Sequence, residues 1–165
     1  MKQKKPLKRT AFKSKSKPLK RKPIKKKKAK GRKRVRKKGI LTVPKLRNKV
    51  WVEFSKFIRN EGAVGGYNTC VTCGEIFEVK GNHAGHFVHG KNKECYFDED
   101  NVHFQCVKCN MFLSGNLLEY YPYMETEYGT ATIERLKNAK TIIWKRENLE
   151  HLYNYYKKLN EKEEE

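Results

Sequence analysis

The chain has 165 residues, which is room for one compact domain with appendages and not for two domains of ordinary size. Its formal net charge of +21 is unevenly placed, because the first 50 positions hold 25 of the 39 Lys and Arg residues and none of the 18 Asp and Glu residues. No secretory leader is evident and no apolar run approaches the roughly 18 residues of a membrane span, so we expect a soluble intracellular protein.

Residues 1–43 are a tract of Lys, Arg, Pro and Ser with only isolated apolar residues. Such a tract cannot bury a core, and like charges repel one another along it, so we expect it to be disordered. Dense positive charge neutralises phosphates, which favours a DNA-binding arm over a localisation signal or a solubilising tail. Lys and Arg side chains on such an arm would contact the DNA backbone without reading its sequence.

After the basic tract, the pattern predicts a folded domain over residues 44–160. Apolar residues at helical spacing predict a first helix over 44–60, with Thr42 as its cap. Residues 67–105 contain turn signals between short apolar stretches, which predict short strands and loops.

Further helices are expected in the second half of the chain. A short one should begin at the second cysteine pair and end at Ser114–Gly115. Pro122 is expected to open another, which ends at Gly129 and is followed by a shorter helical piece. The last helix is predicted over 145–161, with an acidic tail at 161–165.

Two Cys-x-x-Cys pairs, Cys70/Cys73 and Cys106/Cys109, are separated by 32 residues. Zinc takes four thiolates in a tetrahedron, and each pair can present two sulfur atoms to one ion. The spacing therefore predicts a structural Zn²⁺ in a treble-clef layout, in preference to buried thiols or disulfides. Cys95 has no partner at such spacing, and we expect a free, packed thiol there, with replacement of a zinc ligand as the alternative.

Between and just after these pairs lie residues of the types that serve in the active sites of enzymes hydrolysing phosphodiesters. They are His83, His86, Asn101, His103 and Asn110. The reaction needs a base to activate water and a cation to stabilise charge on the scissile phosphate and on the leaving oxygen. A neutral imidazole suits the first task near neutral pH. Oxygen or nitrogen ligands that leave water on Mg²⁺ or Mn²⁺ suit the second.

Several blocks in one order carry a resemblance: His-Ala-Gly-His at 83–86, Phe-Asp-Glu-Asp-Asn-Val-His-x-Gln-Cys at 97–106, Cys-x-x-Cys-Asn at 106–110 and Ser-Gly-Asn-Leu at 114–117. The chain resembles the phage NinG (Rap) recombination endonuclease family, and the wider layout is similar to HNH (His-Me finger) nucleases. The resemblance implies a small α+β fold with a treble-clef, ββα-metal core and flanking helices. It implies a metal-dependent DNA endonuclease that cuts branched DNA, such as Holliday junctions, in the cytoplasm of a bacterial host.

The resemblance also implies roles for individual residues. His86 matches the general base, and Asn101 matches an Asn that fixes a loop through backbone hydrogen bonds. Asn110 falls where this class places a ligand of the catalytic Mg²⁺ or Mn²⁺. His83 falls where we expect an Asp in this family, so as a ligand it suits Mn²⁺ or a softer metal better than Mg²⁺.

Less is expected of the remaining polar residues. His103 is predicted to contact a phosphate or to support the active site, Asn116 is a secondary candidate near the scissile phosphate, and His89 is expected to be exposed. Symmetric cutting of a four-way junction favours a homodimer, and phage recombination proteins are expected partners besides DNA. Two alternatives stay open: a nuclease of ordinary duplex DNA, and a non-catalytic zinc-containing nucleic-acid-binding protein.

Overall fold

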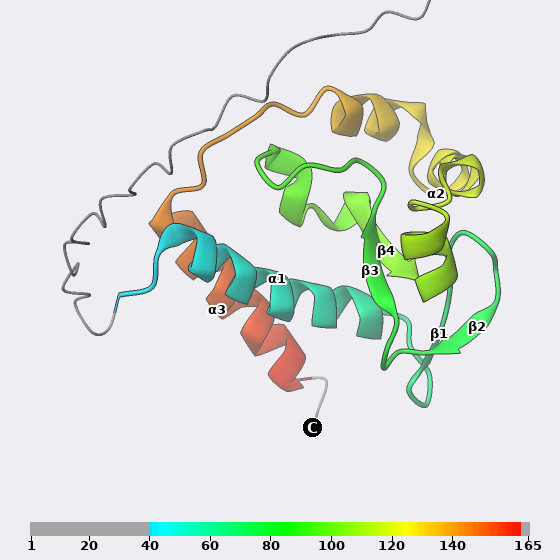
Figure 1. Cartoon of the computed structure of the whole chain (residues 1–165), viewed down its shortest axis with the longest axis horizontal. Coiled ribbons are helices and arrows are strands. Elements are labelled where there is room, and N and C mark those ends of the chain that lie inside the picture. Colours follow the sequence, from blue (N-terminus) through cyan, green and yellow to red (C-terminus); the bar gives the residue numbers. More distant parts are fainter. Residues whose placement is uncertain (1–39, 163–165) are drawn as a thin grey trace, which may run out of the picture. The chain divides into compact units, whose positions relative to one another are not determined.

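The computed structural model describes residues 40–162, so the predicted basic arm lies outside this range except for its last four residues. The described part consists of three long helices, two small antiparallel sheets and three short helical turns (Figure 1), which is a small α+β fold as expected. None of the described helices is long and apolar enough to span a bilayer. The elements in chain order are α1 Val43–Asn60, β1 Tyr67–Thr69, β2 Ile76–Glu78, β3 His83–His86, η1 Glu94–Phe97, η2 Glu99–Asn101, β4 Val102–Gln105, η3 Lys108–Phe112, α2 Leu117–Lys137 and α3 Arg146–Lys162.

The first and last helices pack against each other, and α1 also contacts β3 and β4. The apolar residues whose helical spacing predicts α1 lie on one face, and the helix buries that face. Its buried residues are Leu46, Val50, Phe54 and Ile58. Both helices begin and end within one residue of their predicted bounds. Since α3 continues through Lys162, the first two residues of the predicted acidic tail are helical.

The start of α1 differs from the prediction in one respect. Thr42 precedes the helix in extended backbone, but its hydroxyl makes no capping hydrogen bond. Pro44 lies in the first turn, as its position in the sequence favours. The proline ring fixes φ at a value that suits a helix. Its lack of an N–H costs no helical hydrogen bond, because the N–H groups of the first turn have no carbonyl partner within the helix.

The hairpin of β3 and β4 lies at the centre of the domain, and every residue of β4 is buried. Side chains alternate across it, as a strand requires. Ala84 and Val102 join the core formed by α1 and α3. On the other face, His103 contacts α2 through the hydroxyl of Tyr120. Two helices therefore cover this hairpin from opposite sides, which fixes the positions of the residues at its ends.

The helix α2 begins earlier than predicted. It starts at Leu117, directly after Asn116 in the left-handed conformation, and Pro122 lies inside it. The burial of Tyr120 and Met124 on either side of Pro122 explains why the helix tolerates the proline, because packing offsets a lost backbone hydrogen bond. Gly129 has non-helical backbone angles (φ 77°, ψ 166°), so the helix is interrupted where the sequence indicated.

Candidate metal centre and active-site groove

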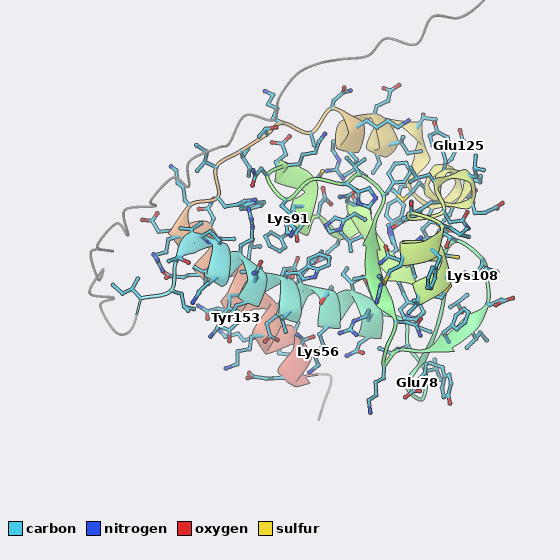
Figure 2. All side chains as sticks on the ribbon, in the orientation of Figure 1. Lys56, Glu78, Lys91, Lys108, Glu125 and Tyr153 are labelled. Carbon is cyan, nitrogen blue, oxygen red and sulfur yellow. The ribbon has the colours of Figure 1, made fainter. Side chains whose placement is uncertain are left out.

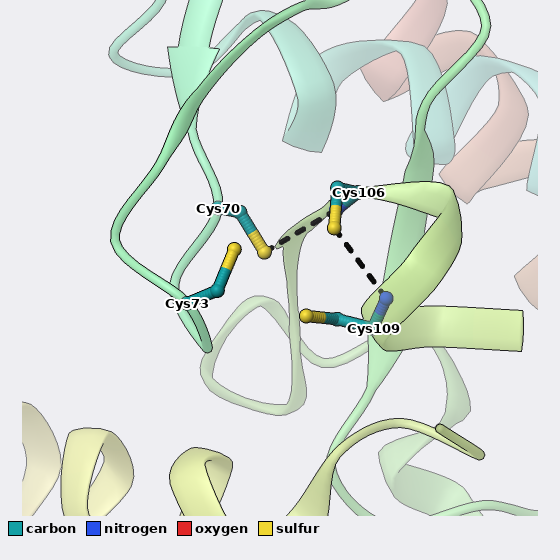
Figure 3. Close-up of side chains that lie close together, drawn as sticks. All are labelled: Cys70, Cys73, Cys106 and Cys109. Carbon is teal, nitrogen blue, oxygen red and sulfur yellow. Dashed lines mark hydrogen bonds between the residues drawn. The ribbon is translucent and has the colours of Figure 1, made fainter. Parts of the chain in front are cut away.

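The four cysteines of the two pairs form one cluster (Figure 3). Cys70 and Cys73 lie on the loop between β1 and β2, while Cys106 and Cys109 lie at the junction of β4 and η3. All four sulfur atoms lie within 4.8 Å of one another. Tetrahedral zinc with Zn–S bonds of about 2.3 Å requires sulfur separations of about 3.8 Å, so a small inward movement completes the geometry. The cluster can therefore hold a structural metal ion such as zinc.

Hydrogen bonds already orient these sulfur atoms. The backbone N–H groups of Cys106 and Cys109 donate to Cys70 Sγ (3.3 Å) and Cys106 Sγ (3.4 Å), as the dashed lines in Figure 3 show. The Thr72 hydroxyl lies 3.2 Å from Cys70 Sγ. Burial raises the pKa of the Cys70 thiol, but the hydrogen bonds from Thr72 and Cys106 outweigh it and lower the pKa to about 7. Hydrogen bonding thus favours the thiolate at Cys70, whereas burial raises the pKa of the Cys73 and Cys106 thiols, whose protons a bound metal ion would displace.

Asn116 belongs to this metal centre and not to the groove described below. Its side-chain amide donates to Cys109 Sγ at 3.7 Å, and its backbone has a φ of 48°. The position near a scissile phosphate stays a prediction, and the contact that the structure shows is with the cysteine cluster. Cys95 is a free, buried thiol packed against α2, as expected, and takes no part in the cluster.

His86 lies at the end of β3, buried in a cluster with two aromatic rings that also contact each other. Its imidazole stacks on the rings of Trp51 and Tyr96, with centroid separations of 4.8 Å in both cases. Nε2 lies 3.0 Å from the backbone carbonyl oxygen of Tyr96. A carbonyl only accepts, so Nε2 carries the proton and Nδ1 is left with its lone pair. Burial lowers the pKa of His86 to about 4, and the ring is therefore neutral at pH 7.

His83 and Asn110 are in direct contact. Asn110 follows Cys109, and its amide Nδ2 donates to Nδ1 of His83 at 2.8 Å. Both line a cavity of about 360 Å³ together with Arg59. The structure thus joins the two residues that the resemblance implies as ligands of a catalytic cation, although they are 27 positions apart in the sequence.

A second cavity of about 470 Å³ adjoins the first, and its lining includes His86, His89 and Lys91. Trp51, Ala84 and Asn110 line both cavities, which together form one groove (the groove below). Neither cavity has Asp or Glu among its lining residues, while Arg59 and Lys91 are basic. Lys91 lies on the loop that follows β3 (Figure 2). Such a surface suits a polyanion better than a cationic ligand.

Asn101 lies outside the groove lining and is completely buried. Its amide oxygen accepts from the Val88 N–H at 2.8 Å, and its nitrogen donates to the carbonyls of Val88 (3.0 Å) and Cys95 (2.8 Å). These hydrogen bonds hold the loop between β3 and β4 in place. They are backbone hydrogen bonds, the kind of bond that the resemblance implies for an Asn at this position. Asn101 therefore acts on the groove only through the loop that it holds.

His103 is buried on the side of the hairpin that faces α2. Its Nδ1 lies 2.7 Å from the Tyr120 hydroxyl, and its Nε2 lies 2.8 Å from the Tyr128 hydroxyl. Tyr120 in turn donates to the Gly85 carbonyl at 3.0 Å. With both ring nitrogens occupied, His103 is placed to support the hairpin beneath the groove and not to contact a phosphate.

Burial of His103 should make stability depend on pH. The pKa of its imidazole is lowered to about 4 by desolvation, against 6.5 for an exposed histidine. Between these values the unfolded chain binds the proton and the folded domain does not, so stability falls as pH falls through that window. We expect His103 to account for about 2 kcal/mol of the stability lost between pH 7 and pH 5.

Urea denaturation of the wild type and of His103→Gln at both pH values checks this expectation. Protonation of the clustered cysteines would release a bound metal ion in acid and destabilise the domain, but it would do so in both proteins. The variant should therefore be less stable at pH 7 and lose less stability on acidification. Equal losses in the two proteins would contradict the assignment.

Two residues of this region were not singled out by the sequence. Trp51 fits the apolar spacing that predicts α1, but it also stacks on His86 and lines both cavities. Gln105 is completely buried in β4. A polar side chain directly before a metal-binding cysteine in an otherwise buried strand is a signal that could have drawn attention to it.

Comparison with known proteins identifies a protein family but finds no similar protein of known structure. The family model described as Bacteriophage Lambda NinG protein matches residues 1–165. The chain is 33% identical over 70 residues to Protein ninG of Salmonella phage P22 and 30% identical over 70 residues to Protein ninG of Escherichia phage lambda. Each match covers 42% of this chain and 34% of the relative, so the chain spans about a third of the length of these relatives. No solved structure matches.

Proposed function

Because the chain belongs to the NinG family of bacteriophage proteins, we propose that it is a metal-dependent endonuclease of branched DNA, such as Holliday junctions, in phage recombination. The proposed core is a treble-clef HNH arrangement, in which zinc on the four cysteines holds the frame. One observation carries the proposal: His83, His86 and Asn110 line one groove beside that cluster, and the hydrogen bond of His86 Nε2 leaves its Nδ1 unprotonated.

In the proposed reaction, Nδ1 of His86 accepts a proton from the attacking water. The Tyr96 carbonyl fixes the tautomer, while the rings of Trp51 and Tyr96 pack against the imidazole and against each other. The low pKa keeps the base unprotonated at neutral pH. A DNA phosphate entering the groove brings negative charge, which raises the pKa of the imidazole toward the range in which a base works best.

Asn110 and His83 are the residues that would hold a catalytic divalent cation. An amide oxygen suits Mg²⁺ or Mn²⁺, and an imidazole nitrogen suits Mn²⁺ better than Mg²⁺. When bound, the cation supplies charge stabilisation at the phosphate and at the leaving oxygen. Zinc on the four cysteines would be structural, because four thiolates leave no open position for water or substrate.

The basic arm of residues 1–43 is proposed to supply DNA affinity, and the groove to supply cleavage. Flexible contacts to phosphates carry no sequence preference, so selectivity for branched DNA would come from the geometry of the folded domain. A homodimer would cut a four-way junction symmetrically. We further propose phage recombination proteins as partners and the host cytoplasm as the place of action.

The rival function is a non-catalytic zinc-containing nucleic-acid-binding protein. The observation in its favour is that neither cavity of the groove is lined by a carboxylate, the ligand on which most Mg²⁺ sites depend. In that case the histidines would pack or touch phosphate, and the groove would be a binding surface only.

Cleavage assays with the full-length, zinc-loaded protein separate these functions. A labelled four-way junction and a linear duplex of the same sequence are incubated with Mg²⁺, with Mn²⁺ or with no divalent cation. We expect cutting only with a divalent cation, faster in Mn²⁺, and about tenfold or more faster on the junction. Equal rates on both DNAs would assign ordinary duplex as the substrate, and binding without cutting in either metal would establish the rival.

A further inference from the structure

Arg59 lies in the last turn of α1, and two backbone carbonyls hold its guanidinium in place. Nε donates to the Ser55 carbonyl at 2.9 Å, within the helix, and a terminal nitrogen donates to the Asn82 carbonyl at 3.3 Å, directly before β3. A guanidinium has five N–H groups, and these hydrogen bonds use two of them. The side chain is therefore fixed in position while donors remain for a ligand.

Asn82, which accepts one of these hydrogen bonds, is itself anchored. Its amide oxygen accepts from the Val107 N–H at 3.0 Å, and its amide nitrogen donates to the Glu78 carbonyl at 2.7 Å. Val107 stands between the two cysteines of the second pair. The position of Arg59 is thus set relative to the four-cysteine cluster as well as to the hairpin.

The charge of Arg59 has no counter-charge close by. Its cavity of about 360 Å³ is also lined by His83 and Asn110, and none of the lining residues is acidic. The ion pairs within the described residues use other basic side chains. Burial lowers the pKa of Arg59, and no neighbouring carboxylate offsets that effect. A partly buried positive charge without a partner is unfavourable, and an anion bound in the cavity would relieve that cost.

The donor geometry and the shape of the groove indicate which kind of anion fits. A guanidinium presents paired N–H groups in one plane, which match two oxygen atoms of a phosphate. The groove continues past Asn110 into the cavity that His86 and Lys91 line. A chain of linked phosphates therefore suits it better than a single small anion.

We propose that Arg59 binds one backbone phosphate of the DNA through its remaining N–H groups, and so positions the strand in the groove that His86 and Asn110 line. The identity of the anion rests on the proposed function, whereas the contact itself does not require cleavage. DNA binding is then divided between two parts of the chain. The basic arm supplies affinity along the whole backbone, and Arg59 holds one phosphate at a defined place.

Four-way junctions that carry a single neutral methylphosphonate test this contact. The neutral group is moved along the strands through the branch, and affinity for the full-length protein is measured without added Mg²⁺ or Mn²⁺. At the contacted phosphate it should weaken binding of the wild type about tenfold, because a charge-assisted hydrogen bond is lost. The same neutral group should have little effect on Arg59→Gln, which has already lost the contact.

Arg146→Gln is the matched control, because Arg146 also donates to a backbone carbonyl but lies outside the groove. Its dependence on the methylphosphonate position should be that of the wild type. A purely structural role of Arg59 would weaken binding to every junction by one factor and leave this dependence unchanged. That result in a folded Arg59→Gln would overturn the proposal, as would a wild type that is insensitive at every position.

Zinc content and the unfolding midpoint show whether Arg59→Gln folds, and the wild type itself provides the test if it does not. Phenylglyoxal modifies arginine side chains, and peptide mass analysis gives separate rates for Arg59 and Arg146. Junction DNA should slow modification of Arg59 and leave that of Arg146 unchanged, whereas an unchanged rate at Arg59 would overturn the proposal. A wild type that shows the phosphate contact but never cuts DNA would refute the nuclease while leaving the phosphate site intact.

Discussion

Removing the metal ion from the four-cysteine cluster is expected to unfold the domain. The cluster ties the loop between β1 and β2 to the end of β4 and the start of η3. Among the described residues, the other links between that loop and β4 are two hydrogen bonds, from the Val71 N–H to the Phe104 carbonyl and from Gln105 to the Thr72 hydroxyl. Structural zinc sites contribute about 10–16 kcal/mol of binding free energy, which exceeds the net stability of most small domains. Chelation, or Cys106→Ser, should therefore abolish the cooperative unfolding transition.

Circular dichroism and zinc analysis before and after chelation measure this effect. Cys95→Ser is the matched control, because it changes a buried cysteine that lies outside the cluster. The control should retain one zinc ion per chain and a cooperative transition, with a modest loss of stability from its position in the core. A domain that keeps its fold without zinc would show that the cluster does not hold the frame.

Removing residues 1–39 is expected to cause the largest loss of DNA affinity. This segment holds 22 of the 39 Lys and Arg residues and no acidic residue, so the rest of the chain carries 17 basic against 18 acidic residues. Each phosphate that the segment neutralises releases counterions, which makes binding strongly dependent on salt. We expect affinity for linear duplex to fall by about a thousandfold or more near 50 mM salt.

The dependence of the binding constant on salt concentration gives a second readout of the same truncation. The slope of log K against log salt should become much shallower, because fewer ions are released. Zinc content should stay unchanged, since all four cysteines remain. A truncated protein with the slope of the full chain would place the phosphate contacts in the folded domain.

The features that the sequence predicts correctly depend mostly on short-range patterns, such as residue spacing and apolar repeats. The cysteine spacing is set by the ligand geometry of a metal ion, and the four sulfur atoms are together in the structure. The helices α1 and α3 each have a strong apolar repeat on one face, which tertiary packing uses without altering. Gly129 interrupts a helix as glycine commonly does.

The features that the sequence does not predict depend on contacts between residues that are far apart in the sequence. Proline is common in the first turn of a helix, so the sequence predicts that Pro122 opens one. The burial of its neighbours on α2 instead keeps Pro122 inside a helix that begins at Leu117. The sequence predicts that His103 contacts a phosphate or supports the active site, and two tyrosines more than fifteen positions away occupy its ring nitrogens, a contact that no local pattern encodes. The direction of the Gln105 oxygen is set by Gly115 and Gly85, and no local pattern encodes it.

The most direct test of the central claim compares full-length wild type with His86→Ala in single-turnover cleavage of a labelled four-way junction with Mn²⁺. Loss of a general base should slow cleavage by about a hundredfold to ten-thousandfold, while zinc content and junction affinity stay those of the wild type. Cleavage at the wild-type rate by a folded, zinc-loaded His86→Ala would contradict the assignment of the base, and with it the mechanism proposed for this groove.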